Sequence, residues 1–92
     1  MATVRLSIDE RGSVMAKAAY RLVRTTPGGV EKSQGPVDSV RRATVLAAYV
    51  LYDNANVSRS EAQGFSVRLG NASLGETVAH EGTGYRFRVE RA

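Results

Sequence analysis

The stretch Glu76-Thr-Val-Ala-His-Glu-Gly-Thr-Gly-Tyr-Arg-Phe-Arg-Val-Glu90 has the pattern of a β-hairpin. Segments 76–80 and 85–90 flank the sequence Glu-Gly-Thr-Gly, whose two glycines suit a tight turn. In the second segment Tyr85, Phe87 and Val89 alternate with Arg86, Arg88 and Glu90. This period of two predicts one buried apolar face and one charged face. Since a lone hairpin is only marginally stable in water, it needs a further strand and packed helices.

The N-terminal segment 2–9 supplies a candidate for that further strand. Val4, Leu6 and Ile8 alternate there with polar residues, again with a period of two. We therefore expect this segment and the C-terminal hairpin to form one antiparallel sheet. The outward face of that sheet would carry Arg5 together with Arg86 and Arg88.

The middle of the chain predicts two helices. The first, Val40–Tyr52, follows Asp38 and Ser39, either of which can cap its N-terminus, and it is apolar nearly all round. The second, Ser58–Leu69, opens with the capping-box pattern Ser-Arg-Ser-Glu and has an apolar stripe. Gly64 weakens this second helix by about 1 kcal/mol relative to alanine.

Residues 14–33 fit two different structures. Two aligned apolar rows, one containing Val14 and Leu22 and the other Met15 and Val23, favour an amphipathic helix over 14–24. The alternative is a pair of strands, 20–25 and 30–33, joined at Pro27-Gly-Gly, which has hairpin chemistry. The helix is preferred because two aligned rows and central alanines rarely occur together by chance.

These elements together predict an α+β fold in which two or three helices pack on one face of a small antiparallel sheet. The sheet would combine the N-terminal strand with the C-terminal hairpin. Ninety-two residues correspond to a single domain, 1–92, with a thin core. The apolar share of 42% and charged share of 24% are typical of a globular protein.

The residue types needed for common catalytic sites are scarce. The chain has no cysteine and one histidine, His80, which cannot supply the usual zinc ligand sets. His80 is expected at an exposed strand end, and an enzyme would have to pair it with Glu81 or Asp9. Pro27-Gly-Gly lacks the lysine and hydroxyl of a phosphate loop. We therefore expect no enzyme activity, no metal and no cofactor.

The sequence also lacks the pattern of a membrane or secreted protein. No apolar run approaches the roughly 20 residues that cross a bilayer. The first ten residues lack the basic start and apolar block of a signal peptide. A cytoplasmic protein is the expectation.

Arginine dominates the charge of the chain. The formal net charge is +4 and the isoelectric point is about 10, which favours an anionic partner. The candidate contact residues are the sheet-face set Arg5, Arg86 and Arg88 and the helix-start set Arg41, Arg42 and Arg59, with Arg68. The alternative is a solvated surface neutralised by Glu76 and Glu90 on the sheet and by Asp38 and Glu61 near the helix starts.

Residues 43–90 resemble the second half of a winged helix-turn-helix domain. Asn54–Val57 would be the turn, Ser58–Leu69 the reading helix and Glu76–Glu90 the wing. The run Gly84-Tyr-Arg-Phe87 is similar to the closing strand of some response-regulator effector domains. The resemblance implies a regulator that reads duplex DNA with Arg59 and Arg68.

The whole chain resembles, in style, the small phage-encoded anti-CRISPR proteins. The likeness lies in its small size, the absence of cysteine and of a catalytic set, and its arginine-rich surface. It implies a cytoplasmic inhibitor without an active site that occupies a protein or nucleoprotein complex of the host cell. Direct contact with an RNA or DNA backbone is part of this expectation, whereas membranes and small-molecule substrates are not. Reversing Arg86 and Arg88 to glutamate is then expected to abolish binding while the fold remains intact.

Overall fold

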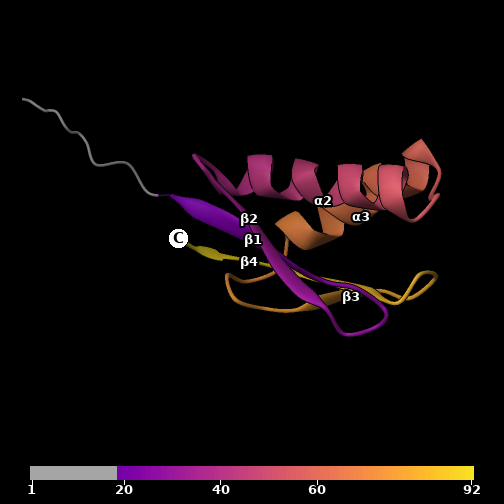
Figure 1. Cartoon of the computed structure of the whole chain (residues 1–92). Coiled ribbons are helices and arrows are strands. Elements are labelled where there is room, and N and C mark those ends of the chain that lie inside the picture. Colours follow the sequence, from indigo (N-terminus) through magenta and orange to yellow (C-terminus); the bar gives the residue numbers. More distant parts are fainter. Residues whose placement is uncertain (1–18) are drawn as a thin grey trace, which may run out of the picture.

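The computed structural model describes residues 19–92, in which a four-stranded antiparallel sheet supports two helices. The elements run in the order β1 (Tyr20–Thr25), β2 (Glu31–Val37), α2 (Val40–Asn54), α3 (Arg59–Gly70), β3 (Val78–His80) and β4 (Tyr85–Arg91). The strands lie in the order β2-β1-β4-β3. Both helices lie on the same side of the sheet (Figure 1), so the predicted α+β fold with helices on one face is confirmed.

The C-terminal hairpin forms as the sequence predicts. β3 pairs with β4 so that Val78 lies opposite Phe87 and His80 lies opposite Tyr85. Phe87 and Val89 are buried against the helices. Arg86 and Arg88, the intervening residues, therefore lie on the opposite face, because successive side chains of a strand alternate.

The preferred helix over residues 14–24 is wrong for its described part. Residues 20–25 form β1, which turns at Pro27-Gly-Gly into β2, as in the alternative interpretation. β1 pairs with β2 on one side and β4 on the other, so it is an interior strand of the sheet. It buries Leu22 toward the helices and Val23 on the opposite face. Strand pairing on both sides overrides the helical periodicity of this short apolar run.

The predicted N-terminal strand 2–9 lies outside the described residues. β1 occupies the place beside the hairpin that was predicted for that segment, with Leu22 opposite Val89. β1 and β4 are thus the two interior strands of the sheet, and β2 and β3 form its edges.

Both predicted helices form, with serine caps. The hydroxyl of Ser39 accepts a hydrogen bond from the backbone N–H of Arg42, so Ser39 rather than Asp38 caps α2. The hydroxyl of Ser58 accepts from the N–H of Glu61 at the start of α3. These bonds satisfy backbone donors that a helix N-terminus leaves free.

The core lies between the helices and the inner face of the sheet. Its largest fully buried side chains come from all of these elements: Phe87, Leu22, Leu51 and Leu69. The ring of Phe65, on α3, packs 5.3 Å from that of Phe87. One face of each helix is thereby covered, and the faces that point away from the sheet are left for the surface.

Candidate binding surface

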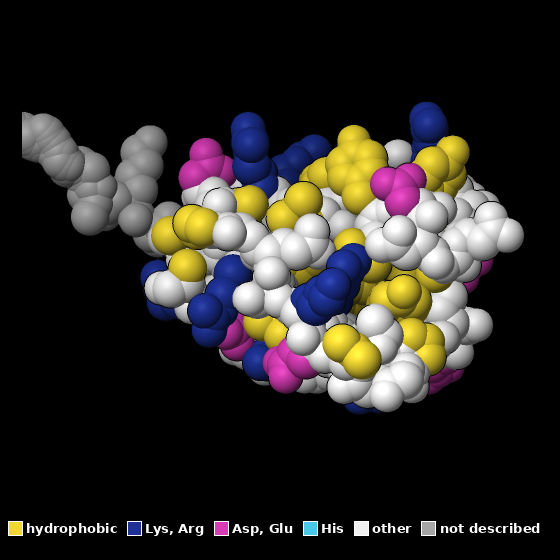
Figure 2. Space-filling model, in the orientation of Figure 1, with side chains coloured by type: hydrophobic (Ala, Val, Ile, Leu, Met, Phe, Trp, Pro, Cys, Tyr) yellow, Lys and Arg dark blue, Asp and Glu magenta, His cyan; other side chains and the backbone are white. Residues whose placement is uncertain are grey.

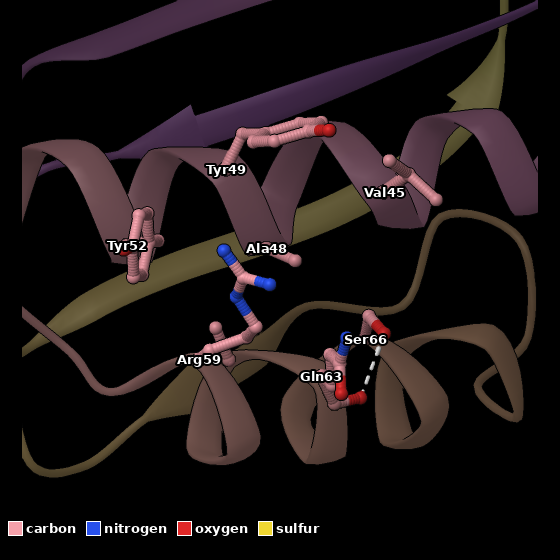
Figure 3. A pocket seen from close by; sticks show the side chains of 8 residues that line it. Val45, Ala48, Tyr49, Tyr52, Arg59, Gln63 and Ser66 are labelled. Atoms are coloured by element: carbon pink, nitrogen blue, oxygen red, sulfur yellow. Dashed lines mark hydrogen bonds between the residues drawn. The ribbon is translucent and has the colours of Figure 1, made fainter.

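A hollow of about 300 Å³ separates the outer faces of α2 and α3. It is lined from α2 by Val45, Ala48, Tyr49 and Tyr52 and from α3 by Arg59, Ala62, Gln63 and Ser66. Tyr49 is 60% exposed and Tyr52 is 46% exposed. Figure 3 shows both rings projecting from α2, while the side chain of Arg59 extends from α3 toward them.

A second hollow, of about 520 Å³, continues along the N-terminal half of α2. Its lining includes Arg41 and Arg42, and it shares Val45 and Tyr49 with the first hollow. The two hollows therefore form one surface feature, which we call the α2–α3 groove. Its lining residues, all within the described part of the chain, include three arginines and no acid.

The arginines at the start of α2 lie in an unfavourable electrostatic position. Arg41 and Arg42 occupy the first turn of α2, which contains no acidic residue. The free N–H groups of a helix start carry partial positive charge, so a cation there costs about 0.3–1 kcal/mol. Asp38 lies 3.5 Å from Arg42, but both side chains are largely exposed, so the pair is weak. An anion bound at this end of α2 would offset the unfavourable interaction between the arginines and the helix start.

Arg59 is held against an aromatic ring at the other end of the groove. Its guanidinium lies 5.7 Å from the centroid of the Tyr52 ring. A contact of this kind at an exposed site contributes about 0.5–1 kcal/mol and leaves the N–H donors free to bind an anion. Figure 2 shows Lys and Arg side chains over the start of α2, with hydrophobic side chains farther along it.

The sheet-face set is engaged differently from the helix-start set. Arg88 bonds to Glu90 at 2.9 Å and to Glu31 at 2.9 Å, and Arg21 also donates to Glu90 at 2.7 Å. The hydrogen bond from Arg88, followed by that from Arg21, lowers the pKa of the Glu90 carboxyl. The same contacts with Glu90 and Glu31 raise the pKa of Arg88.

The sheet face therefore carries a balanced ion-pair network around Arg88. Arg86, on the same face, is exposed. Of the two acids predicted to neutralise this face, Glu90 pairs with Arg88, and the second acid that pairs with Arg88 is Glu31 rather than Glu76. Arg5 lies outside the described residues. A new anion at Arg88 would therefore meet the negative charge of two carboxylates.

Arg68, a predicted DNA contact, is used within the fold. Its guanidinium lies 5.2 Å from the centroid of the Phe65 ring and donates to the backbone carbonyl of Ala79 at 3.2 Å. Of the four helix-borne candidates, Arg41, Arg42 and Arg59 therefore lie along the groove and Arg68 does not.

His80 is buried, which corrects the expectation of an exposed strand-end histidine. Only 5% of the residue is exposed. Its Nε2 lies 2.8 Å from a carboxylate oxygen of Glu61 and its Nδ1 lies 2.9 Å from the hydroxyl of Thr83. The ring also packs edge-on against Phe65 at 5.4 Å.

The contacts of His80 tie α3 to the turn between β3 and β4. Within residues 19–92 the partner carboxylate is Glu61 rather than Glu81, and it comes from a distant element because α3 packs over the hairpin. Asp9 lies outside the described residues. The Thr83 hydroxyl accepts from the N–H of Tyr85 as well, so it helps to close the turn. These contacts hold the turn between β3 and β4 against α3.

Within residues 19–92, no group of three or more His, Asp or Glu side chains is placed to hold a metal ion. No helix of that part is long and apolar enough to cross a membrane.

The exposed tyrosines were missed as site residues by sequence reasoning. One signal was available: Val40–Tyr52 is apolar nearly all round, which is more than one sheet-facing stripe requires. Within residues 19–92, α2 packs against the sheet and α3, and Val45, Tyr49 and Tyr52 remain exposed. Their spacing of four and then three residues places them on one helical face.

Comparison with known proteins adds no relative. No protein-family model matches the chain, and neither a curated protein nor a solved structure matches it significantly.

Proposed function

We propose that this chain is a non-catalytic binding domain that occupies an anionic surface of a macromolecular partner. The resemblance to small phage-encoded anti-CRISPR proteins makes this proposal more specific. The chain would be a small phage-type inhibitor that blocks a nucleoprotein complex of the host cell. The observation that carries the proposal is the α2–α3 groove, whose lining within residues 19–92 combines three arginines with two exposed tyrosines and no acid.

The groove has the composition of a macromolecular contact surface. Tyrosine and arginine are the residues that most often dominate the energy of such interfaces. Exposed apolar side chains that gather on one face favour an interaction site, whereas scattered ones do not. Arg41 and Arg42 add charge at a helix start where their own fold gains nothing from it.

The groove replaces the sheet face as the preferred contact. Arg88 is paired with Glu90 and Glu31, so a new anion would meet two carboxylates beside its guanidinium. Arg41 and Arg59 have no such carboxylate partners among the ion pairs of residues 19–92. The three arginines of the groove are thus the stronger candidates.

Affinity capture from the native host tests the proposal with a matched pair of triple variants. The groove variant Arg41→Gln, Arg42→Gln, Arg59→Gln removes three charges from the helices. The control variant Lys32→Gln, Arg86→Gln, Arg91→Gln removes three from the sheet. We expect wild type and control to retain one nucleoprotein complex that the groove variant loses. Equal capture by all three proteins, or none above bare beads, would contradict the proposal.

A winged-helix regulator is the second candidate, favoured by the observed order of helix, turn, helix and hairpin. It requires duplex DNA to be bound by the pure protein, with an affinity that falls steeply as salt rises. Arg68 would have to leave Phe65 and the carbonyl of Ala79 to reach DNA. A gel-shift titration at low salt that shows no duplex binding would remove this candidate.

A further inference from the structure

The exposed faces of Tyr49 and Tyr52 lie between the arginines of the groove. Arg41 and Arg42 stand at one end and Arg59 at the other, and all five residues line the two joined hollows. From residue 41 to residue 52, α2 rises about 16 Å. A stacked nucleic-acid strand advances about 3.4 Å per nucleotide, so the groove matches about five nucleotides.

We propose that the α2–α3 groove binds single-stranded nucleic acid, with bases stacked on Tyr49 and Tyr52 and phosphates held by Arg41, Arg42 and Arg59. The inference rests on the proposed function and names the anionic component of the partner. Proteins that bind single strands without sequence preference combine a basic groove with aromatic side chains on which successive bases stack.

The tyrosine rings have the exposure that stacking requires. Tyr49 is 60% exposed and Tyr52 46% exposed, and both rings project from α2 at the groove (Figure 3). The guanidinium of Arg59 lies 5.7 Å from the Tyr52 centroid, where it can contact both a base plane and a phosphate. Arginine thus brackets the stacking surface.

Hydrogen-bonding groups on α3 complete the lining. Gln63 and Ser66 lie on the α3 wall, where the Ser66 hydroxyl donates to the Gln63 backbone carbonyl at 2.7 Å. The amide of Gln63 can meet the edge of an unpaired base. In a paired duplex the base faces are stacked and the Watson–Crick edges are paired, so the groove favours a single strand.

Charge complementarity favours this occupant. Among the described residues no carboxylate lines either hollow, and Asp38, which pairs with Arg42 at 3.5 Å, is outside both linings. Glu61, the acid of the first turn of α3, is turned to His80 at 2.8 Å instead. A polyphosphate strand would therefore meet arginines along the groove, with no carboxylate among the described lining residues.

Fluorescence anisotropy of labelled oligothymidine and oligouridine, each of about 15 nucleotides, tests the inference with the full chain. We expect wild type to bind both probes, with log affinity falling by about 2 per tenfold rise in salt, because three phosphate contacts each contribute about 0.7. A labelled duplex of the same length should bind more weakly.

Two variants separate stacking from charge. Tyr49→Leu with Tyr52→Leu keeps apolar cover but removes both rings, and it should lower affinity at least about five-fold while leaving the salt slope unchanged. Arg41→Gln with Arg42→Gln should lower the slope by about 1.4. Arg86→Gln, on the sheet, should change affinity less than about two-fold. Thermal melts confirm that each variant is folded.

The contrary outcomes are distinct for the two proposals. Absence of binding to both oligonucleotides, or binding that Tyr49→Leu with Tyr52→Leu leaves unchanged, overturns the single-strand inference. If the groove variant nevertheless loses the captured host complex, the proposed function stands and the contact is with protein. If capture is unaffected as well, both proposals fail.

Discussion

Arg41→Glu should make the domain more stable while it weakens partner binding. Arg41 lies in the first turn of α2, where the helix start carries partial positive charge and no acid is present. Removing the cation and adding an anion each contribute about 0.3–1 kcal/mol at such a position. The expected gain is therefore about 1 kcal/mol, and a domain of this size then melts about 4–8 °C higher.

Circular dichroism during thermal and urea unfolding measures this gain. Arg41→Gln, which only removes the charge, should give about half of it. Arg42→Glu should give less than Arg41→Glu, because the new carboxylate would face Asp38, which now lies 3.5 Å from Arg42. At about 1 M salt, where charges are screened within about 3 Å, the gain should largely vanish.

A loss of stability in Arg41→Glu, or a gain that persists at high salt, would refute the electrostatic argument. Improved affinity for an anionic probe in the same variant would refute the link between this charge and binding. The expected result, opposite signs for stability and binding, would show that the arginine serves a partner rather than the fold.

Three further predictions concern the frame that holds the groove. Gly64→Ala should stabilise α3 by roughly 1 kcal/mol, since a Cβ there meets nothing within 4 Å, and urea unfolding measures it; an unchanged midpoint would contradict this reasoning. Gly35→Ala should destabilise by more than about 1 kcal/mol in the same assay, because its φ is +127° and a Cβ would lie 3.1 Å from the Tyr20 carbonyl; full stability would show that the strand can shift. The hydrogen bond from Arg88 lowers the pKa of Glu90 from its ordinary 4.5. The ionised Glu90 therefore stabilises the fold above pH 4.5, and this stabilisation is lost as the pH falls through the lowered pKa. Glu90→Gln should therefore flatten the acid limb of the stability curve, measured by urea unfolding between about pH 2 and 6, and an unchanged limb would contradict the assignment.

The elements predicted correctly are those whose local signals agree with their tertiary setting. The alternation in 85–90, the serine before each helix and the apolar stripe of α3 all match the observed structure. The segment 20–25 was predicted wrongly because Leu22 and Val23 are buried on opposite faces of a paired strand, which also fits two rows of a helix. Only the pairing with β2 and β4 decides between a strand and a helix for this segment.

The candidate site was predictable in charge but not in shape. The sequence indicated Arg41, Arg42 and Arg59 as one basic group, and the structure places them along one groove. The sequence could not show that Arg88 pairs with Glu31, because Glu31 lies on a strand that was predicted only as the alternative for residues 30–33. Nor could the sequence show that Tyr49 and Tyr52 are exposed within residues 19–92, because exposure depends on how α2 and α3 pack.

The most direct measurement of the central claim is a titration of the ¹⁵N-labelled chain with oligothymidine, followed by amide chemical shifts. The account predicts that the largest changes fall on α2 and α3 around Arg41, Tyr49, Tyr52 and Arg59, with β4 largely unaffected. Changes centred on Arg86 and Arg88, or no changes at saturating oligonucleotide, would contradict it.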